Sequence, residues 1–175
     1  MALLTERELG GLLRSFQRTA FRFEVRDSYN SEVGREAFRR FLAQEPDAFL
    51  WHQQWLDKLR RDHEQGKRWQ RIRIVTVPVS DWTRYGVTVG RLNVQAGEDI
   101  RYLRRSAAEA LGLQPYDAWL LDDEQLVRMH FDDLDDSFIG AEIITYAATL
   151  EKHRAWQQLA WQHAQPLDVF AASLP

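Results

Sequence analysis

The chain contains no cysteine, which excludes disulfide bonds and any zinc or iron–sulfur site built on thiolate ligands. No apolar run approaches the roughly 20 residues that a membrane-spanning helix needs. The first residues, Met1-Ala2-Leu3-Leu4-Thr5-Glu6, have neither the basic start nor the long apolar segment of a signal peptide. We therefore expect a cytoplasmic protein that makes no contact with a membrane.

A strong charge of either sign is also lacking. The 23 Lys and Arg nearly balance the 26 Asp and Glu, and the formal net charge of −3 gives no reason to expect direct binding to nucleic acid. Hydrophobic residues, in contrast, make up 45% of the chain, and seven of the 175 residues are Trp. This is enough for one domain with a substantial core. We predict a single domain over residues 1–175, with its core at about 5–165 and a tail, 166–175, that is partly ordered at most.

Hydrophobic periodicity predicts helices and strands that alternate along the chain. Thr5 and Glu8 form a capping box for a helix that runs to about residue 18. Phe21 to Arg26 then alternates aromatic and charged residues, as a strand does. Further helices are expected over 31–45, 47–64, 80–95 and 147–165, and further strands over 71–77, 100–103 and 138–144.

Residues 115–131 predict a β-hairpin with an acidic turn. Trp119-Leu120-Leu121 is a short apolar run, Asp122 to Gln125 is turn-like, and Leu126 to Phe131 alternates apolar and polar residues. Together these elements indicate an α/β fold, with α+β as the alternative. The expected architecture is a mixed five- to six-stranded sheet flanked by helices.

Four motifs together resemble one family. They are Phe-Arg-Phe-Glu-Val-Arg-Asp (21–27), Gly-Glu-Asp-Ile-Arg-Tyr-Leu (97–103), Met-His-Phe-Asp-Asp (129–133) and His-Arg-Ala-Trp-x-x-Leu-Ala-Trp-x-x-Ala (153–164). That family is actinobacterial, is labelled only as a domain of unknown function, and often occurs beside helix-turn-helix regulators of the Xre type. The resemblance covers about residues 12–170 and implies a regulatory role with such a regulator as partner.

The hairpin also resembles the central hairpin of phospholipase D-like domains, and residues 71–165 resemble one half of such a domain in their order of elements. In that superfamily a His-x-Lys-x-x-x-x-Asp motif runs along the strand. With Asp122 at the motif's Asp, Pro115 stands at the position of the nucleophilic His and Asp117 at that of the Lys. The resemblance therefore implies a phospholipase D-like fold that has lost its catalytic motif.

Charged residues of several strands form the candidate binding site. Arginine side chains can hold a phosphate or carboxylate through paired hydrogen bonds. The candidates are Arg22, Glu24, Arg73, Glu98, Arg101 and His130. The alternative is a solvated sheet face with cross-strand ion pairs.

Three functions remain open. The first is a non-catalytic regulatory or ligand-sensing domain that acts through a partner, with a small anion as ligand. The second is a hydrolase or lyase in which Asp132 orients His130 beside the Arg cluster, acting on a phosphorylated or carboxylated metabolite. The third is a homodimeric scaffold. We predict no cofactor and no metal, because the acidic run 132–136 lacks the glycine and the distal Glu of a calcium loop.

Overall fold

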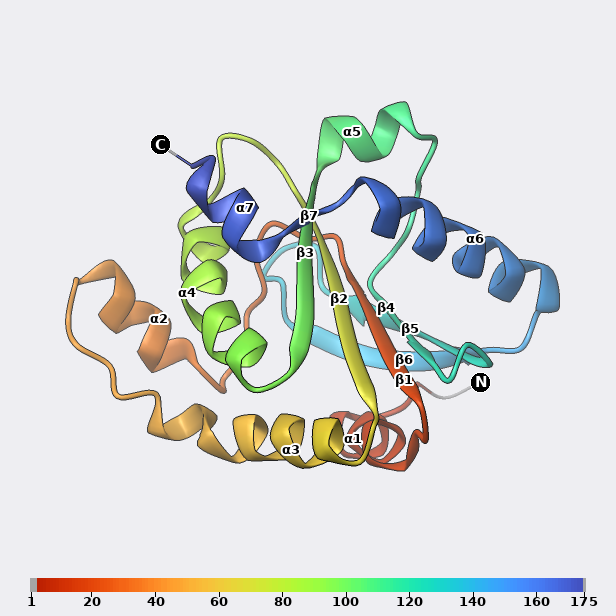
Figure 1. Ribbon diagram of the computed structural model, residues 1–175, viewed down its shortest axis with the longest axis horizontal. Helices are drawn as coiled ribbons and strands as arrows, with labels where there is room; N and C mark the ends of the chain where they lie inside the picture. Colours follow the sequence, from red (N-terminus) through yellow and green to blue (C-terminus); the bar gives the residue numbers. More distant parts are fainter. Residues whose placement is uncertain (1–2, 175) are drawn as a thin grey trace.

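The computed structural model describes residues 3–174, which form an open, mixed seven-stranded sheet with helices on both faces (Figure 1). The strands are β1 (Thr19–Glu24), β2 (Arg68–Val75), β3 (Glu98–Arg104), β4 (Ala118–Leu121), β5 (Gln125–Phe131), β6 (Phe138–Ile144) and β7 (Gln165–Pro166). The helices are α1 (Glu6–Ser15), α2 (Arg35–Leu42), a 3-10 turn η1 (Leu50–His52), α3 (Gln53–Glu64), α4 (Asp81–Gln95), α5 (Arg105–Ala110), α6 (Ala147–His163) and α7 (Leu167–Ala172).

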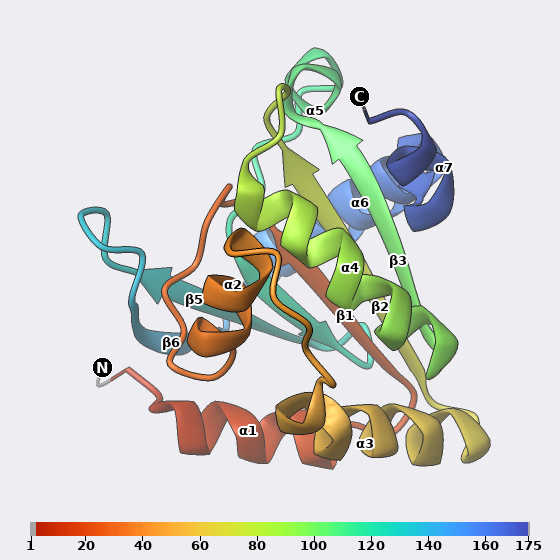
Figure 2. The same cartoon turned by 90° about the vertical axis from the view of Figure 1, so that its left-hand side faces the viewer.

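The strand order is β6-β5-β4-β1-β2-β3-β7, with a parallel centre and antiparallel flanks. β1, β2 and β3 are parallel, so each connection between them crosses a face of the sheet through helices: α2 and α3 after β1, and α4 after β2. The helices α1, α3 and α4 cover one face, and α6 lies on the other (Figures 1 and 2). Strands covered on both faces have no solvated side.

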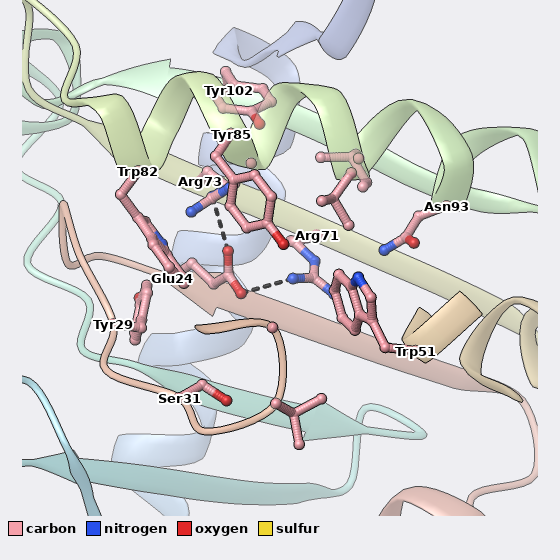
Figure 3. A pocket seen from close by; sticks show the side chains of 16 residues that line it. Glu24, Tyr29, Ser31, Trp51, Arg71, Arg73, Trp82, Tyr85, Asn93 and Tyr102 are labelled. Carbon is pink, nitrogen blue, oxygen red and sulfur yellow. Dashed lines mark hydrogen bonds and ion pairs between the residues drawn. The ribbon is translucent and has the colours of Figure 1, made fainter. Parts of the chain in front are cut away.

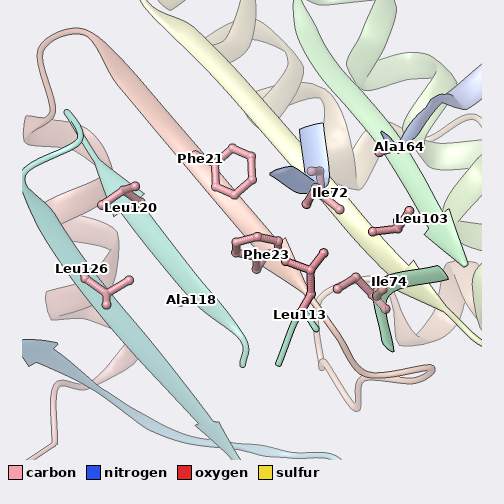
Figure 4. Packing of buried hydrophobic residues seen from close by; sticks show 12 residues of the cluster. Phe21, Phe23, Ile72, Ile74, Leu103, Leu113, Ala118, Leu120, Leu126 and Ala164 are labelled. Carbon is pink, nitrogen blue, oxygen red and sulfur yellow. The ribbon is translucent and has the colours of Figure 1, made fainter. Parts of the chain in front are cut away.

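The face under α5 and α6 carries one continuous cluster of buried apolar residues. Phe21 and Phe23 of β1, Ile72 and Ile74 of β2, and Leu103 of β3 are almost completely buried there (Figure 4). The period of two that predicts β1 therefore places its aromatic residues correctly. The charged residues that alternate with them point to the other face, which is also covered by helices.

The predicted hairpin is confirmed as β4 and β5. Asp122 and Asp123 take positive φ values of 54° and 60°, as the two central residues of a type I′ turn do. The Asp122 carboxylate accepts the backbone N–H groups of Arg18 and Thr19 at 2.6 and 2.9 Å. This acidic turn thus fixes the point at which β1 begins.

Two expectations are wrong at the C-terminus. The sheet has seven strands where five to six were expected, because Gln165–Pro166 pairs with β3 as β7. Residues 166–174 of the tail are also ordered: Leu167 and Phe170 of α7 are buried, and the Phe170 ring stacks on Tyr102 with 4.3 Å between centroids. Two apolar residues three apart form one face of a short helix, and Pro166 precedes that helix as its N-cap residue.

Candidate functional site

Charged side chains of three parallel strands meet on the face covered by α4. In the sheet register Arg22 lies opposite Arg71 and Glu24 opposite Arg73, so all four project to the same side. Glu98 at the start of β3 completes the group. Arg22, Arg73 and Glu98 are 4%, 7% and 2% exposed, so the set is not a solvated strand face. Charges that are this buried require partners.

Glu24 lies at the centre of the set and binds two arginines. Its Oε1 accepts from Arg71 Nη1 at 2.7 Å, and its Oε2 lies 2.9 Å from Arg73 Nε (Figure 3). Burial alone would raise the pKa of this carboxyl, but the charges of the neighbouring arginines outweigh it and lower the pKa to about 2. Glu24 is therefore ionised over the whole physiological range.

The network continues from Arg71 toward α4 and η1. Arg71 Nε donates to Glu98 Oε1 at 2.8 Å, and Asn93 Nδ2 donates to Glu98 Oε2 at 2.8 Å. His52 Nε2 then lies 2.6 Å from the side-chain oxygen Oδ1 of Asn93. Because this oxygen can only accept a hydrogen bond, Nε2 of His52 carries the proton. Burial lowers the pKa of His52, which keeps the ring neutral.

At its other end the network reaches the start of β4. Arg22 Nη2 donates to Asp117 Oδ1 at 2.9 Å, and the Tyr29 hydroxyl donates to the same oxygen at 2.6 Å. Burial raises the pKa of Asp117, although the charge of Arg22 opposes this shift. Three arginines and three carboxylates thus form one buried chain whose formal charges cancel.

A cavity of about 240 Å³ opens between this network and α4, and we call it the α4 cavity. Glu24, Arg71 and Arg73 form its floor (Figure 3). Its aromatic walls are Tyr29, Trp51, Trp82, Tyr85 and Tyr102. The cavity therefore combines a charged base with flat apolar sides, as small-molecule sites do.

Two buried hydroxyls that border the α4 cavity are unpaired. The hydroxyls of Tyr85 and Tyr102 are buried without a hydrogen-bond partner among residues 3–174. Arg73 contacts Glu24 through Nε at 2.9 Å. Burial raises the pKa of Tyr85 to about 12, so its hydroxyl keeps its proton. Buried polar groups are normally satisfied, so water or a ligand in the cavity would complete the hydrogen bonds of these hydroxyls.

Four of the six predicted site residues come together here: Arg22, Glu24, Arg73 and Glu98. The other two do not, because Arg101 and His130 project from the opposite face of the sheet. Arg101 packs over the Trp161 ring of α6 at 4.0 Å, and His130 Nε2 lies 2.9 Å from Glu142 Oε1. Asp132 does not orient His130, since a register shift follows His130 and Asp132 accepts the Leu134 amide instead.

Other members of the site lie outside the set of six predicted residues. Arg71 could be found from the alternation of β2, because it lies two residues before Arg73 and projects to the same side. Asp117 could be found from the alignment with the hairpin motif, where it stands at the position of the Lys. The α4 residues show a stronger signal, because they recur at helical spacing and include two glycines. They are Trp82, Tyr85, Gly86, Val89, Gly90 and Asn93. The two glycines allow close packing against the helix, since a Cβ at Gly86 would meet Arg73 and one at Gly90 would meet Leu167.

Metal-binding geometry is not found in the part of the chain that the structure describes, where no group of three or more His, Asp or Glu is placed to hold an ion. The carboxylates of the acidic run 132–136 instead accept hydrogen bonds from Arg26 and from backbone amides of their own loop. Asp136 binds Arg26 at 2.5 Å, and Asp135 accepts the Ser137 amide. Among the described helices none is long and apolar enough to cross a bilayer.

The fold and the site define a mixed α/β domain with an arginine-based, aromatic-walled cavity beside its central strands. The chain belongs to the family described as "Domain of unknown function (DUF6879)", which it matches over residues 7–172. The expectation of membership in a family of domains of unknown function is thereby confirmed. No curated protein matches the chain.

Proposed function

We propose that this domain is a non-catalytic, ligand-sensing regulatory domain that binds a small anion in the α4 cavity and acts through a protein partner. One observation carries the proposal: the unpaired hydroxyls of Tyr85 and Tyr102 at the cavity can each donate a hydrogen bond. Both oxygens of Glu24 and both of Glu98 are already engaged by Arg71, Arg73 and Asn93. An ionised carboxylate or phosphate accepts from the guanidinium and the phenols together.

The shape of the cavity narrows the ligand class. A volume of about 240 Å³ lies below the usual range for drug-sized ligands, so the ligand is small. The rings of Trp82 and Tyr85 offer flat apolar contacts above the charged floor. We therefore propose a compact anion with one planar or apolar part, such as an aromatic carboxylate or phosphate ester.

A catalytic function has less support. The hydrolase or lyase alternative required His130 beside the arginines, and His130 lies on the opposite face, where its Nε2 is 2.9 Å from Glu142 Oε1. Asp117, which stands where the phospholipase D-like motif has its Lys, is buried in contact with Arg22 and Tyr29. The proposed relation to phospholipase D-like domains is supported by element order and by the hairpin, with the motif's chemistry replaced by an ion pair.

The partner that we propose is a helix-turn-helix regulator of the Xre type, on the strength of the family resemblance. Co-expression of the full chain with such a regulator from a neighbouring gene tests this part. A complex whose stability changes when the anion is added supports the proposal. Failure of every such regulator to co-purify, with and without the anion, removes the partner from it.

Ligand binding is tested by calorimetry on the full chain with inorganic phosphate, benzoate and phenyl phosphate. Tyr85→Phe removes one unpaired donor, and Tyr146→Phe is the matched control because Tyr146 is 71% exposed. Loss of a hydrogen bond to a charged group should weaken phenyl phosphate binding roughly tenfold or more in Tyr85→Phe. The control should bind as the wild type does. No binding of any of the three anions contradicts the proposal.

A further inference from the structure

A second hollow lies on the same face of the sheet, between α1 and the strands β4 to β6, and we call it the α1 cavity. Its volume is about 340 Å³. Its apolar walls are Leu9, Leu13, Trp119, Met129, Phe131 and Phe138. Glu24, Tyr29 and Ser31 border both cavities, which are therefore neighbours, and the other residues that line the α1 cavity are different.

One buried polar group borders the α1 cavity without a partner. Arg22 is 4% exposed; its Nη2 donates to Asp117 at 2.9 Å, and its Nε lies 3.9 Å from Glu24 Oε1. Its Nη1 is buried and has no hydrogen-bond partner among residues 3–174. An unmade hydrogen bond at a buried charged donor is unfavourable, so an oxygen supplied by a ligand in this cavity would be stabilised there.

The charges around Arg22 decide which kind of oxygen fits. Asp117 already neutralises the guanidinium at 2.9 Å, and Glu24 is the next carboxylate at 3.9 Å. An anionic ligand would place a third negative charge beside Arg22 in a buried site, which is unfavourable. Arg73 at the α4 cavity differs, because among residues 3–174 it contacts one carboxylate, Glu24. A carbonyl oxygen completes the hydrogen bond without adding charge.

We infer that the α1 cavity is a second binding site, for an uncharged apolar molecule that has one acceptor oxygen at its end, such as a ketone, ester or amide. The apolar body packs between α1 and the sheet, against Leu13, Trp119 and Met129. The oxygen accepts from Arg22 Nη1. This site and its ligand class are separate from those of the α4 cavity.

A direct probe is available because the chain has two methionines and Met129 lines this cavity. The full chain is labelled at the methionine methyl carbons, and the Met129 signal is assigned with Met129→Leu. Octan-2-one is titrated as the neutral probe and octanoate as the charged one. We expect octan-2-one to shift the Met129 signal to saturation, and octanoate to bind roughly tenfold more weakly because of the added negative charge.

Two adjacent glycines of α1 provide a matched pair of variants. Gly10 borders the cavity and Gly11 does not, and a Cβ at either position meets only the end of the flexible Arg14 side chain. Both Gly10→Leu and Gly11→Leu raise helix propensity, so both should fold. Leucine at position 10 occupies the cavity and should weaken octan-2-one roughly tenfold or more, whereas Gly11→Leu should bind as the wild type does.

Three outcomes overturn the inference: an unchanged Met129 signal with octan-2-one, undiminished binding by Gly10→Leu, or octanoate that binds as tightly as the ketone. The binding of octan-2-one in the α1 cavity does not depend on the proposed binding of an anion in the α4 cavity. Tyr85→Phe alters the α4 cavity and should leave octan-2-one binding unchanged, so the failure of one site is distinguishable from the failure of the other.

Discussion

The guanidinium of Arg73 rests against the backbone of Gly86, so closely that a Cβ atom at position 86 would lie 1.8 Å from Arg73 Nη1. A glycine inside an α-helix destabilises it by about 1 kcal/mol relative to alanine, so its presence in the middle of α4 needs a reason. The reason is room for a buried arginine that also binds Glu24. The packing of α4 on the sheet and the position of Arg73 in the ion-pair network therefore depend on each other.

Gly86→Ala should destabilise the protein in spite of its better helix propensity. The new methyl group forces Arg73 away from its place, and overpacking of this kind costs about 1–3 kcal/mol. Urea unfolding measures the change in free energy. The control is Gly11→Ala in α1, where the nearest atom to the new Cβ is the end of Arg14 at 4.0 Å, and it should leave stability unchanged or raise it. A Gly86→Ala protein as stable as the wild type would contradict the contact.

Glu24→Gln should be strongly destabilising. The substitution removes the charge that Arg71 and Arg73 share and leaves both guanidinium groups buried without it, a loss of about 3–5 kcal/mol. Glu36→Gln is the control: the pKa of Glu36 is also lowered to about 2, by hydrogen bonds from Arg39 and Arg40, but Glu36 lies exposed on α2. The control should change the unfolding free energy little. Equal effects of the two substitutions would show that burial of the Glu24 network is unimportant.

The ionisation of Glu24 also makes the stability of the fold depend on pH in the acid range. The folded-state pKa of Glu24 is about 2, below its ordinary value of 4.5, so its contribution is fully present above pH 4.5. It is lost as the pH falls from about 4.5 through about 2, because the unfolded chain takes up the proton first. The difference in unfolding free energy between wild type and Glu24→Gln should therefore shrink across this window when measured by urea unfolding.

Protonation of His153 should lower the stability of the fold at a higher pH than protonation of Glu24 does. Its ring is 2% exposed, packs 4.4 Å from Tyr116, and leaves Nε2 unpaired among residues 3–174. Burial, with smaller effects of Lys152 and Arg128, lowers the pKa of His153 from 6.5 to about 4. The unfolded state thus binds a proton first, and stability falls as the pH drops from 6.5 to 4, by about 1.4 kcal/mol for each unit of pKa shift.

His153→Phe tests this origin of acid sensitivity. The substitution keeps an aromatic ring among Tyr116 and Trp156 and removes the group that titrates. Thermal unfolding followed between pH 7 and 4 should show a smaller loss of stability than in the wild type. His163→Phe is the control, since His163 is exposed near the end of α6. An unchanged pH profile in His153→Phe would assign the acid sensitivity to other groups.

Local pattern in the sequence was enough to predict much of the fold. The capping box of α1, the hairpin of β4 and β5, and β6 follow from short-range signals of a few residues. The burial of Arg22 and Glu24 does not, because alternating charge on a strand is equally typical of a solvated face. Helices from distant parts of the chain cover that face, and this covering is tertiary information.

The candidate site, like the fold, could be predicted from the sequence only in part. Arg22, Glu24, Arg73 and Glu98 are predicted together because their strands and strand-entry turns are expected to lie close in the sheet. The parallel pairing of β1, β2 and β3 brings them together. Arg101 was misassigned because one residue of offset along a strand moves a side chain to the opposite face. Its neighbour Tyr102 is the one that borders the α4 cavity. Strand boundaries inferred from sequence are not accurate enough to fix this parity.

The C-terminal helix offers the last test, because the stack of Phe170 on Tyr102 joins α7 to the wall of the α4 cavity. Phe170 is 1% exposed, so Phe170→Ala removes a buried ring and should cost about 3–5 kcal/mol. Val169→Ala is the control on the same helix, since Val169 is 54% exposed. The unfolding free energy in urea measures both changes.

Loss of Phe170 should also weaken phenyl phosphate binding, because Tyr102 then lacks the ring that holds its phenol at the cavity. If Phe170→Ala unfolds at the same urea concentration as Val169→Ala, α7 does not pack as a part of the domain. If it is destabilised but binds the anion normally, the position of Tyr102 does not depend on the stack. Only a combined loss, with Val169→Ala unaffected, fits the contact between Tyr102 and Phe170.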